Sequence, residues 1–363
     1  MNLQMMIGKI KRLNFKALFS LITFSLLITS YYFNNYTFIG IYILFFLISF
    51  YSTKNGLKVI KSLKLLQNIR EDGPALHFSK KNTPTAGGVF LVTPFLILLL
   101  IIFINSYSIK ILLLLFSIFG FFIIGLLDDF LSIKNQNNTG LKVNEKFIFQ
   151  SIVATVFIGL AYATELIYPS ISITNTWEIN SNLMIIPISF FTLVGLSNSV
   201  NLTDGLDGLA TGCSSIVFFG LGTEILLKER EEFIIFSVLC YAMSGLCVGF
   251  LKFNRYPAKI FMGDTGSLSI GATIGSISIL TNSFLIIFIM CGIFLVESIS
   301  VIIQVTFFKF TKKFLRDGKR IFLMTPLHHH FELMGVKEEK IVENFWKINI
   351  LLVIFGIVLK IIL

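Results

Sequence analysis

The feature that most constrains this 363-residue chain is a succession of apolar runs that approach or exceed the length of a membrane-spanning helix. A helix needs about 20 residues to cross the hydrocarbon core of a bilayer. The runs are continuous, whereas the strands of a membrane barrel would alternate apolar and polar residues. Hydrophobic residues make up 55% of the chain and charged residues only 14%, which is too little charge to cover a soluble domain of this length. The sequence therefore predicts an all-α, polytopic integral membrane protein.

Ten membrane spans can be drawn from these runs. They cover residues 36–52, 89–104, 109–127, 147–167, 183–201, 208–227, 233–251, 266–281, 284–308 and 345–363. A further run, 17–33, has two interpretations: an eleventh span that forms a helical hairpin with the next one, or a short helix in the outer membrane interface. We accordingly divide the chain into an amino-terminal extension, 1–35, and a membrane-embedded domain, 36–363.

Basic residues divide unevenly between the connections on the two sides of the predicted membrane domain. The loops on one side hold only Lys228 and Arg230. The other side comprises 53–88, 128–146, 252–265 and 309–344, with seven, three, three and eight Lys or Arg. Because positive charge stays in the cytoplasm, these basic loops are expected inside, and they explain the net charge of +10 without nucleic acid. None is long enough for a core of its own, so an active site must be built from cytoplasmic loops and helix ends.

Five aspartates lie on the predicted cytoplasmic side of a chain that has only 20 acidic residues. Asp128 and Asp129 end one span, Asp204 and Asp207 follow another, and Asp264 precedes a third. Adjacent carboxylates repel one another and resist desolvation, so they persist best beside a cation. Oxygen ligands without thiolates suit Mg²⁺ rather than Zn²⁺. Taken alone, Asp128 and Asp129 are explained by a solvated helix end, and Asp204, Asp207 and Asp264 by turns. Together the five predict a magnesium-dependent site that handles phosphate.

Each of the other polar residues on the same side is, by itself, weaker evidence for a functional site. Lys80 and Lys146 are suited to bind the phosphates of a nucleotide or a lipid head group, but they also serve as topology determinants. Three consecutive histidines, 328–330, are a poor metal site, because on a helix they point about 100° apart. Glu297 lies inside the predicted span 284–308, where a carboxylate is costly. It is expected either to form an internal hydrogen bond or to face a groove for a lipid carrier.

In their order along the chain, these motifs resemble the phospho-N-acetylmuramoyl-pentapeptide transferase family, within the polyprenyl-phosphate N-acetylhexosamine-1-phosphate transferases. The resemblance covers nearly the whole chain from about residue 36. It includes Asp128-Asp129, Asn-Leu-Thr-Asp-Gly-Leu-Asp-Gly at 201–208, Phe-Met-Gly-Asp-Thr-Gly-Ser-Leu at 261–268 and Pro-Leu-His-His-His-Phe-Glu at 326–332. The last motif is typical of the muramoyl-pentapeptide branch.

The resemblance implies transfer of phospho-N-acetylmuramoyl-pentapeptide from its UDP donor to undecaprenyl phosphate, giving lipid I and UMP. It also implies a ten-span homodimer in the bacterial plasma (inner) membrane, in contact with membrane lipid and with a cytoplasmic active site. Carried over by position, Asp264 would bind Mg²⁺, and Asp128 and Asp129 would deprotonate or position the lipid phosphate. The resemblance assigns catalytic or substrate-site roles to His328, His329 and His330. It assigns substrate binding to Lys80, Thr85, Lys146, Asn201, Asp204, Asp207, Asn254 and Phe261.

Two rival functions remain at this stage. One is an N-acetylglucosamine-1-phosphate transferase of the same wider group, which donor preference would distinguish. The other is a cation transporter, whose acidic residues would line a path across the bilayer, whereas here they gather at one face. Direct attack by the lipid phosphate is favoured over a route through a phosphorylated aspartate, but the sequence does not separate the two.

Overall fold

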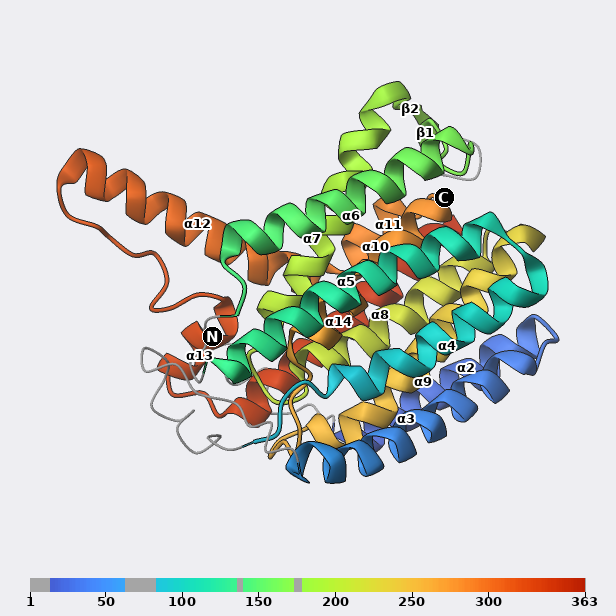
Figure 1. The fold of residues 1–363 in the computed structure, drawn as a ribbon, viewed down its shortest axis with the longest axis horizontal. Coiled ribbons are helices and arrows are strands. Elements are labelled where there is room, and N and C mark those ends of the chain that lie inside the picture. The colour runs from blue at the N-terminus through green and yellow to red at the C-terminus, as the bar shows by residue number, and fades with distance from the viewer. Residues whose placement is uncertain (1–13, 63–82, 136–139, 173–177, 363) are drawn as a thin grey trace.

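The computed structural model of the protein describes residues 14–62, 83–135, 140–172 and 178–362. These segments hold thirteen α-helices and a single two-stranded antiparallel sheet. Figure 1 shows the long helices side by side as a bundle, with the small sheet at one end. The prediction of an all-α, polytopic architecture is confirmed.

The described elements run in the following order. The long helices are α2 (Phe15–Tyr32), α3 (Thr37–Ser62), α4 (Gly88–Ser106), α5 (Ile109–Lys134), α6 (Val143–Ala163), α7 (Ile185–Thr203), α8 (Leu209–Leu226), α9 (Ile234–Asn254), α10 (Gly263–Leu280), α12 (Gly292–Leu315) and α14 (Glu338–Ile362). The short elements are β1 (Ser170–Ser172), β2 (Glu178–Asn180), α11 (Phe284–Met290), α13 (Leu327–Leu333) and the 3₁₀ turns Asn182–Met184 and Glu231–Phe233.

Ten of these helices are long and apolar enough to cross a membrane. The set includes α2 and omits α10, although α10 has 18 residues and is buried along almost its whole length. Helix α10 is rich in small residues because it packs closely on α7. A Cβ added at Gly271 would lie 2.5 Å from the carbonyl oxygen of Leu196, which is the small-residue contact expected between membrane helices.

Helix α2 folds back against α3 as a helical hairpin, which is one of the two interpretations of the run 17–33. The turn is closed by Asn35, whose side-chain oxygen accepts the backbone N–H of Thr37 at 3.1 Å. The ring of Phe19 on α2 packs against those of Tyr42 and Phe46 on α3, with centroid distances of 6.3 and 4.9 Å. In Figure 1 the two helices lie along each other at the edge of the bundle.

The predicted single span 284–308 is wrong, because the structure divides it into α11 and α12 at Cys291. Gly292 follows the break, and a glycine tolerates the bend of the backbone that a continuous apolar run does not reveal. Helix α12 then projects away from the rest of the bundle (Figure 1). As a result, Glu297 lies in the second turn of a new helix and not in the middle of a long span.

Candidate active site

Two adjacent aspartates near the end of α5 meet a third in the first turn of α10. Asp128, Asp129 and Asp264 each offer a carboxylate oxygen, and these oxygens lie within 4.8 Å of one another. The meeting depends on close packing of the two helices. A Cβ added at Gly125 would lie 2.3 Å from the carbonyl oxygen of Asp264, so a larger residue would push α10 away. We call these three residues the carboxylate cluster.

Asp129 fixes the amino-terminal end of α10. Its Oδ1 accepts the backbone N–H of Asp264 at 2.9 Å, and its Oδ2 accepts the backbone N–H and the hydroxyl of Thr265 at 3.0 and 2.6 Å. The first N–H groups of a helix have no partner within the helix and attract negative charge. Gly263 has a φ of +72°, and a Cβ there would lie 2.6 Å from Oδ2 of Asp129. Both oxygens of Asp129 therefore bind the first turn of α10, which carries Asp264.

Lys146 supplies the positive charge of the cluster. Its ammonium group forms an ion pair with Oδ1 of Asp128 at 3.0 Å and a hydrogen-bonded ion pair with Oδ2 of Asp264. Oδ1 of Asp128 also accepts the backbone N–H of Leu141 at 3.0 Å. The side chains of Lys146 and Asp264 keep 19% and 22% of their surface exposed. They are therefore accessible from outside, while Asp129 is 7% exposed.

Asn201 connects the cluster to the end of α7. Its side-chain amide donates to Oδ1 of Asp264 at 2.8 Å and to the hydroxyl of Ser267 at 2.9 Å. Asp264 is thus held by Asn201 on one oxygen and by Lys146 on the other. The structure brings together five of the polar residues on which the sequence analysis rests: Asp128, Asp129, Lys146, Asn201 and Asp264.

A neighbouring network holds the remaining residues of the 201–208 motif and the segment that follows α9. Oδ2 of Asp207 accepts the backbone N–H of Ala258 at 2.8 Å, and the backbone N–H of Asp207 donates to Glu338 of α14 at 2.8 Å. Asn254 is buried, accepts the hydroxyl of Thr211 at 2.8 Å and donates to a loop carbonyl. This network orders the loops beside the carboxylate cluster.

The other predicted substrate-site residues lie in three different settings. Phe261 donates its backbone N–H to the carbonyl of Pro84 at 2.8 Å, which joins the loop before α10 to the segment before α4. Thr85 is buried in that segment, and Asp204 caps the end of α7. Lys80 lies outside the described residues. The functional roles assigned to all of these residues stay predictions.

The three consecutive histidines have three different environments. His328 is fully buried, and Glu297 of α12 binds it twice, accepting its backbone N–H at 3.2 Å and contacting its Nδ1 at 3.0 Å. His329 pairs through Nδ1 with Glu332 at 2.7 Å, and His330 accepts the backbone N–H of Leu323. Of the two roles expected for Glu297, the structure therefore shows the internal hydrogen bond.

Several residues that complete the site were not predicted from the sequence. Thr265 binds Asp129 of the carboxylate cluster, Ser267 accepts a hydrogen bond from Asn201, and both follow Asp264 within three residues. Their position next to Asp264, a candidate metal ligand, could have identified them as site residues from the sequence. Glu338 gave no comparable signal, since it is 131 positions from Asp207 and meets it only through the packing of α14.

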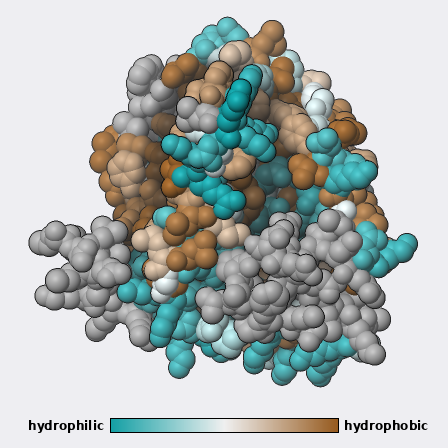
Figure 2. Space-filling view, turned by 90° about the vertical axis from the view of Figure 1, so that its left-hand side faces the viewer, coloured by the Kyte–Doolittle hydropathy of each residue, from teal (hydrophilic) through white to brown (hydrophobic). Residues whose placement is uncertain are grey.

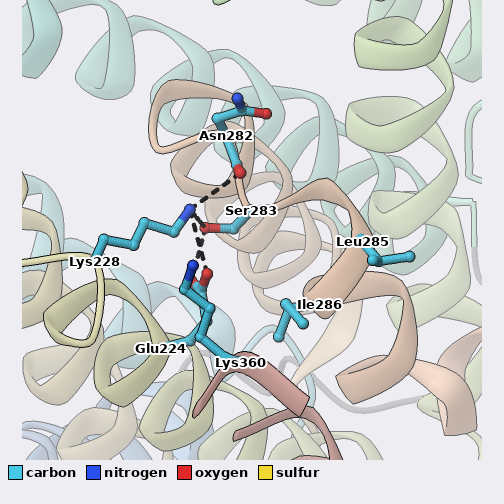
Figure 3. Close-up of a pocket in the computed structure, with 7 residues that line it drawn as sticks. All are labelled: Glu224, Lys228, Asn282, Ser283, Leu285, Ile286 and Lys360. Atoms are coloured by element: carbon cyan, nitrogen blue, oxygen red, sulfur yellow. Dashed lines mark hydrogen bonds and ion pairs between the residues drawn. The ribbon is translucent and has the colours of Figure 1, made fainter. Parts of the chain in front are cut away.

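A separate polar network lies at the opposite end of α8, an 18-residue helix that is about 27 Å long. Lys228 donates to the carbonyl of Asn282 and pairs with Glu224 at 3.2 Å (Figure 3). It also donates to the carbonyl of Thr281. Glu224, Lys228, Asn282 and Lys360 line a small cavity. This network is remote from the carboxylate cluster. It joins the end of α8 to the end of α10, beside Lys360 of α14.

The end of the molecule that carries α12 and α13 exposes a group of hydrophilic residues. In Figure 2, which views this end, hydrophilic residues gather in the middle of the face and hydrophobic residues flank them. Apolar flanks around a polar end are the pattern of a protein whose sides contact lipid and whose end contacts water.

Comparison with known proteins agrees with this geometry. A model of Glycosyl transferase family 4 matches residues 111–282, which include the carboxylate cluster. The phospho-N-acetylmuramoyl-pentapeptide-transferases of Prochlorococcus marinus strains MIT 9301 and MIT 9312 are 67% and 68% identical over 356 residues, which cover 98% of this chain and 99% of each relative. The transferase of that name from Synechococcus sp. strain CC9605 is 41% identical over 84% of this chain and 87% of its own length. The chain belongs to the phospho-N-acetylmuramoyl-pentapeptide transferase family.

Proposed function

We propose that the protein transfers phospho-N-acetylmuramoyl-pentapeptide from its UDP donor to undecaprenyl phosphate, giving lipid I and UMP in peptidoglycan synthesis. The observation that carries the proposal is the carboxylate cluster with Lys146 and Asn201 at one end of the helix bundle. Transfer between two phosphates needs little covalent chemistry from the protein, and it depends on alignment and on stabilising negative charge. Membership of the family supports this transferase over a cation transporter.

The cluster fits a magnesium ion. Its donors are all carboxylate oxygens, which Mg²⁺ prefers. Three carboxylates and one ammonium group leave a formal charge of −2, which a divalent cation would balance. Asp264 would bind the ion, because the side chains of Lys146 and Asn201 bind its oxygens, whereas backbone N–H groups bind Asp129 and Oδ1 of Asp128. When bound, the ion would neutralise charge on the transferred phosphate.

Residues of the chain would orient the substrates and accept the proton. Lys146 and Asn201 would orient Asp264 and the donor phosphates, and Asp128 would accept a residual proton from the lipid phosphate. An oxygen of that phosphate attacks the β-phosphorus of the donor, the bond to the α-phosphate breaks, and UMP leaves. A route through a phosphorylated aspartate is the alternative. His328, His329 and His330 would have the catalytic or substrate-site roles that the family resemblance implies.

The setting that we propose is the bacterial plasma (inner) membrane, with the carboxylate cluster on the cytoplasmic face. The basic loops on that side support this orientation. Residues 36–363 would form the membrane-embedded transferase domain, and residues 1–35 an extension to it. The working form would be a homodimer surrounded by membrane lipid.

One assay tests the proposed function. Purified protein in detergent is given undecaprenyl phosphate, Mg²⁺ and either the UDP-muramoyl-pentapeptide donor or UDP-N-acetylglucosamine, and UMP release and the lipid product are measured. We expect turnover with the first donor only, and loss of turnover after chelation that added Mg²⁺ restores. Turnover with UDP-N-acetylglucosamine alone would move the protein to the other branch of the wider group. Full activity in the presence of a chelator would contradict the magnesium site.

A further inference from the structure

The first residue of α2 contacts two cations from the end of α9. Lys252 Nζ lies 5.3 Å from the centroid of the Phe15 ring, and the guanidinium carbon of Arg255 lies 5.0 Å from it. Phe15 is only 8% exposed. A cation within about 6 Å of an aromatic face is attracted by the negative potential of the ring. The amino-terminal hairpin is thus fixed to α9 at the same end of the bundle as the carboxylate cluster.

Arg255 begins the loop that leads to the site. This segment, the 255–262 loop, ends directly before Gly263 and Asp264. The backbone N–H of Ala258 donates to the carboxylate of Asp207 at 2.8 Å, as described above. The loop therefore joins the end of α9, where Phe15 makes its contact, to the 201–208 motif and to the start of α10.

Arg255 also contacts the 201–208 motif directly. Gly208 ends that motif with a φ of +79°, and a Cβ added there would lie 3.2 Å from Cα of Arg255. The backbone of Arg255 therefore packs against the turn that follows Asp207, while its side chain packs against Phe15. A shift of the arginine side chain would be transmitted to both the loop and the turn.

We propose that Phe15 is a positioning residue for the donor site. Its ring holds Lys252 and Arg255. Through Arg255 it holds the 255–262 loop and the Gly208 turn, which contain or adjoin the predicted substrate-binding residues Phe261 and Asp207, in the arrangement that binds the donor. The inference rests on the proposed function and deepens it, because it gives the amino-terminal extension a part in substrate binding. Phe15 belongs to α2, outside the carboxylate cluster, so its effect falls on donor binding and not on the chemical step.

The alternative is that Phe15 only stabilises the helical hairpin by apolar packing. Two substitutions separate these roles. Phe15→Leu keeps an apolar side chain but removes the aromatic face, whereas Phe15→Trp keeps that face. Phe24→Leu is the matched control, since Phe24 lies on the same helix and is 65% exposed.

The experiment measures donor KM, kcat and the affinity for UMP by calorimetry, using the full-length protein in detergent. For Phe15→Leu we expect donor KM and the Kd for UMP to rise about 2–5-fold, which is about 0.4–1 kcal/mol at 1.36 kcal/mol per tenfold. We expect kcat to stay within about twofold and the unfolding temperature to fall only slightly. Phe15→Trp and Phe24→Leu should both resemble the wild type.

A double-mutant cycle with Arg255→Met completes the test. We expect the effects of Phe15→Leu and Arg255→Met on UMP affinity to be less than additive, because each breaks the same contact. Additive effects, an unchanged KM in Phe15→Leu, or a loss of kcat in parallel with thermal stability would each overturn the inference. A wild-type protein that does not bind UMP would overturn the proposed function itself, which is a distinct result from normal binding in every variant.

Discussion

Oδ1 of Asp129 accepts the backbone N–H of Asp264 at 2.9 Å, so one carboxylate of the cluster holds the backbone of another. This relationship distinguishes the two adjacent aspartates. The oxygens of Asp129 are taken by the first turn of α10, whereas Asp128 uses Oδ1 for both Lys146 and Leu141. We therefore expect Asp129 to have a structural role at the start of α10 and Asp128 to take part in the reaction.

The first prediction follows from this division. Asp128→Asn should lower kcat at least 100-fold, in the range typical of a proton-transfer group, with little change in the unfolding temperature. Asp129→Asn should lower both kcat and thermal stability, because an amide presents a donor to the N–H groups of α10 and weakens a cap of about 0.5–2 kcal/mol. Kinetics and thermal unfolding of both variants check this. Equal stabilities would show that Asp129 is not a structural cap.

The second prediction concerns the metal. Asp264→Asn should abolish turnover and raise the Mg²⁺ concentration needed for any residual activity, because the variant loses the carboxylate that Lys146 and Asn201 orient. Asp317→Asn is the control, since Asp317 is an exposed carboxylate in the segment after α12. A magnesium titration of activity and of thermal stability measures both. Near-normal turnover of Asp264→Asn at low Mg²⁺ would refute the assignment of this ligand.

The third prediction tests the close approach of the backbone at the site. Gly263→Ala places a Cβ 2.6 Å from Oδ2 of Asp129 at a backbone position with a φ of +72°. Something must shift, and the displaced group is the one that holds Asp264, so we expect a loss of at least tenfold in kcat. Gly40→Ala should be silent, because nothing lies within 4 Å of the added Cβ. Wild-type kinetics of Gly263→Ala would show that this geometry tolerates a shift.

The fourth prediction concerns the buried pair of Glu297 and His328. Both side chains are fully buried, and removing one partner of a buried hydrogen-bonded pair costs about 1–3 kcal/mol because the other is left unsatisfied. Glu297→Ala should therefore lower the unfolding temperature strongly and reduce turnover, since His328 lies in a motif that the family resemblance places at the substrate site. Glu343→Ala, which removes a more exposed pair with Lys347, is the comparison and should have a small effect. Similar unfolding temperatures for the two variants would contradict the structural importance of Glu297.

Much of the fold was predictable because each span is encoded locally, in a run of apolar residues of the right length. The exceptions are physical. Helix α10 is surrounded by protein and carries many polar small residues, so its hydropathy is not that of a helix facing lipid. The break at Cys291 was hidden because a bend between two apolar helices needs no polar residue.

The chemistry of the site was predictable from residue types, but the different contacts of the individual carboxylates were not. The pattern of Asp128, Asp129 and Asp264 indicated a cation site, and the three residues do meet. Which carboxylate binds backbone and which binds Lys146 depends on the crossing of α5 and α10. The same holds for Glu297, whose partner His328 lies 31 positions away and reaches it only when the last loop folds back on α12.

The last prediction concerns the topology of the amino-terminal hairpin. Helix α2 has 18 residues, enough to cross a membrane near the lower limit, and it lies along α3 with a turn at Asn34 and Asn35. Because Phe15 contacts Arg255, the start of α2 lies at the end of the bundle that carries the carboxylate cluster.

Cysteine labelling in intact cells tests this topology directly. Lys16 is exposed at the start of α2 and Tyr32 is exposed at its end, while all four native cysteines are buried and give a low background. With a membrane-impermeant thiol reagent that reaches only the outer face of the plasma membrane, Tyr32→Cys should be labelled. Lys16→Cys should be protected until the membrane is permeabilised, since the positive charges of this end favour the cytoplasm. Labelling of both variants in intact cells would place α2 in the outer interface and would exclude an eleventh span. Labelling of Lys16→Cys alone would invert the orientation proposed for the carboxylate cluster.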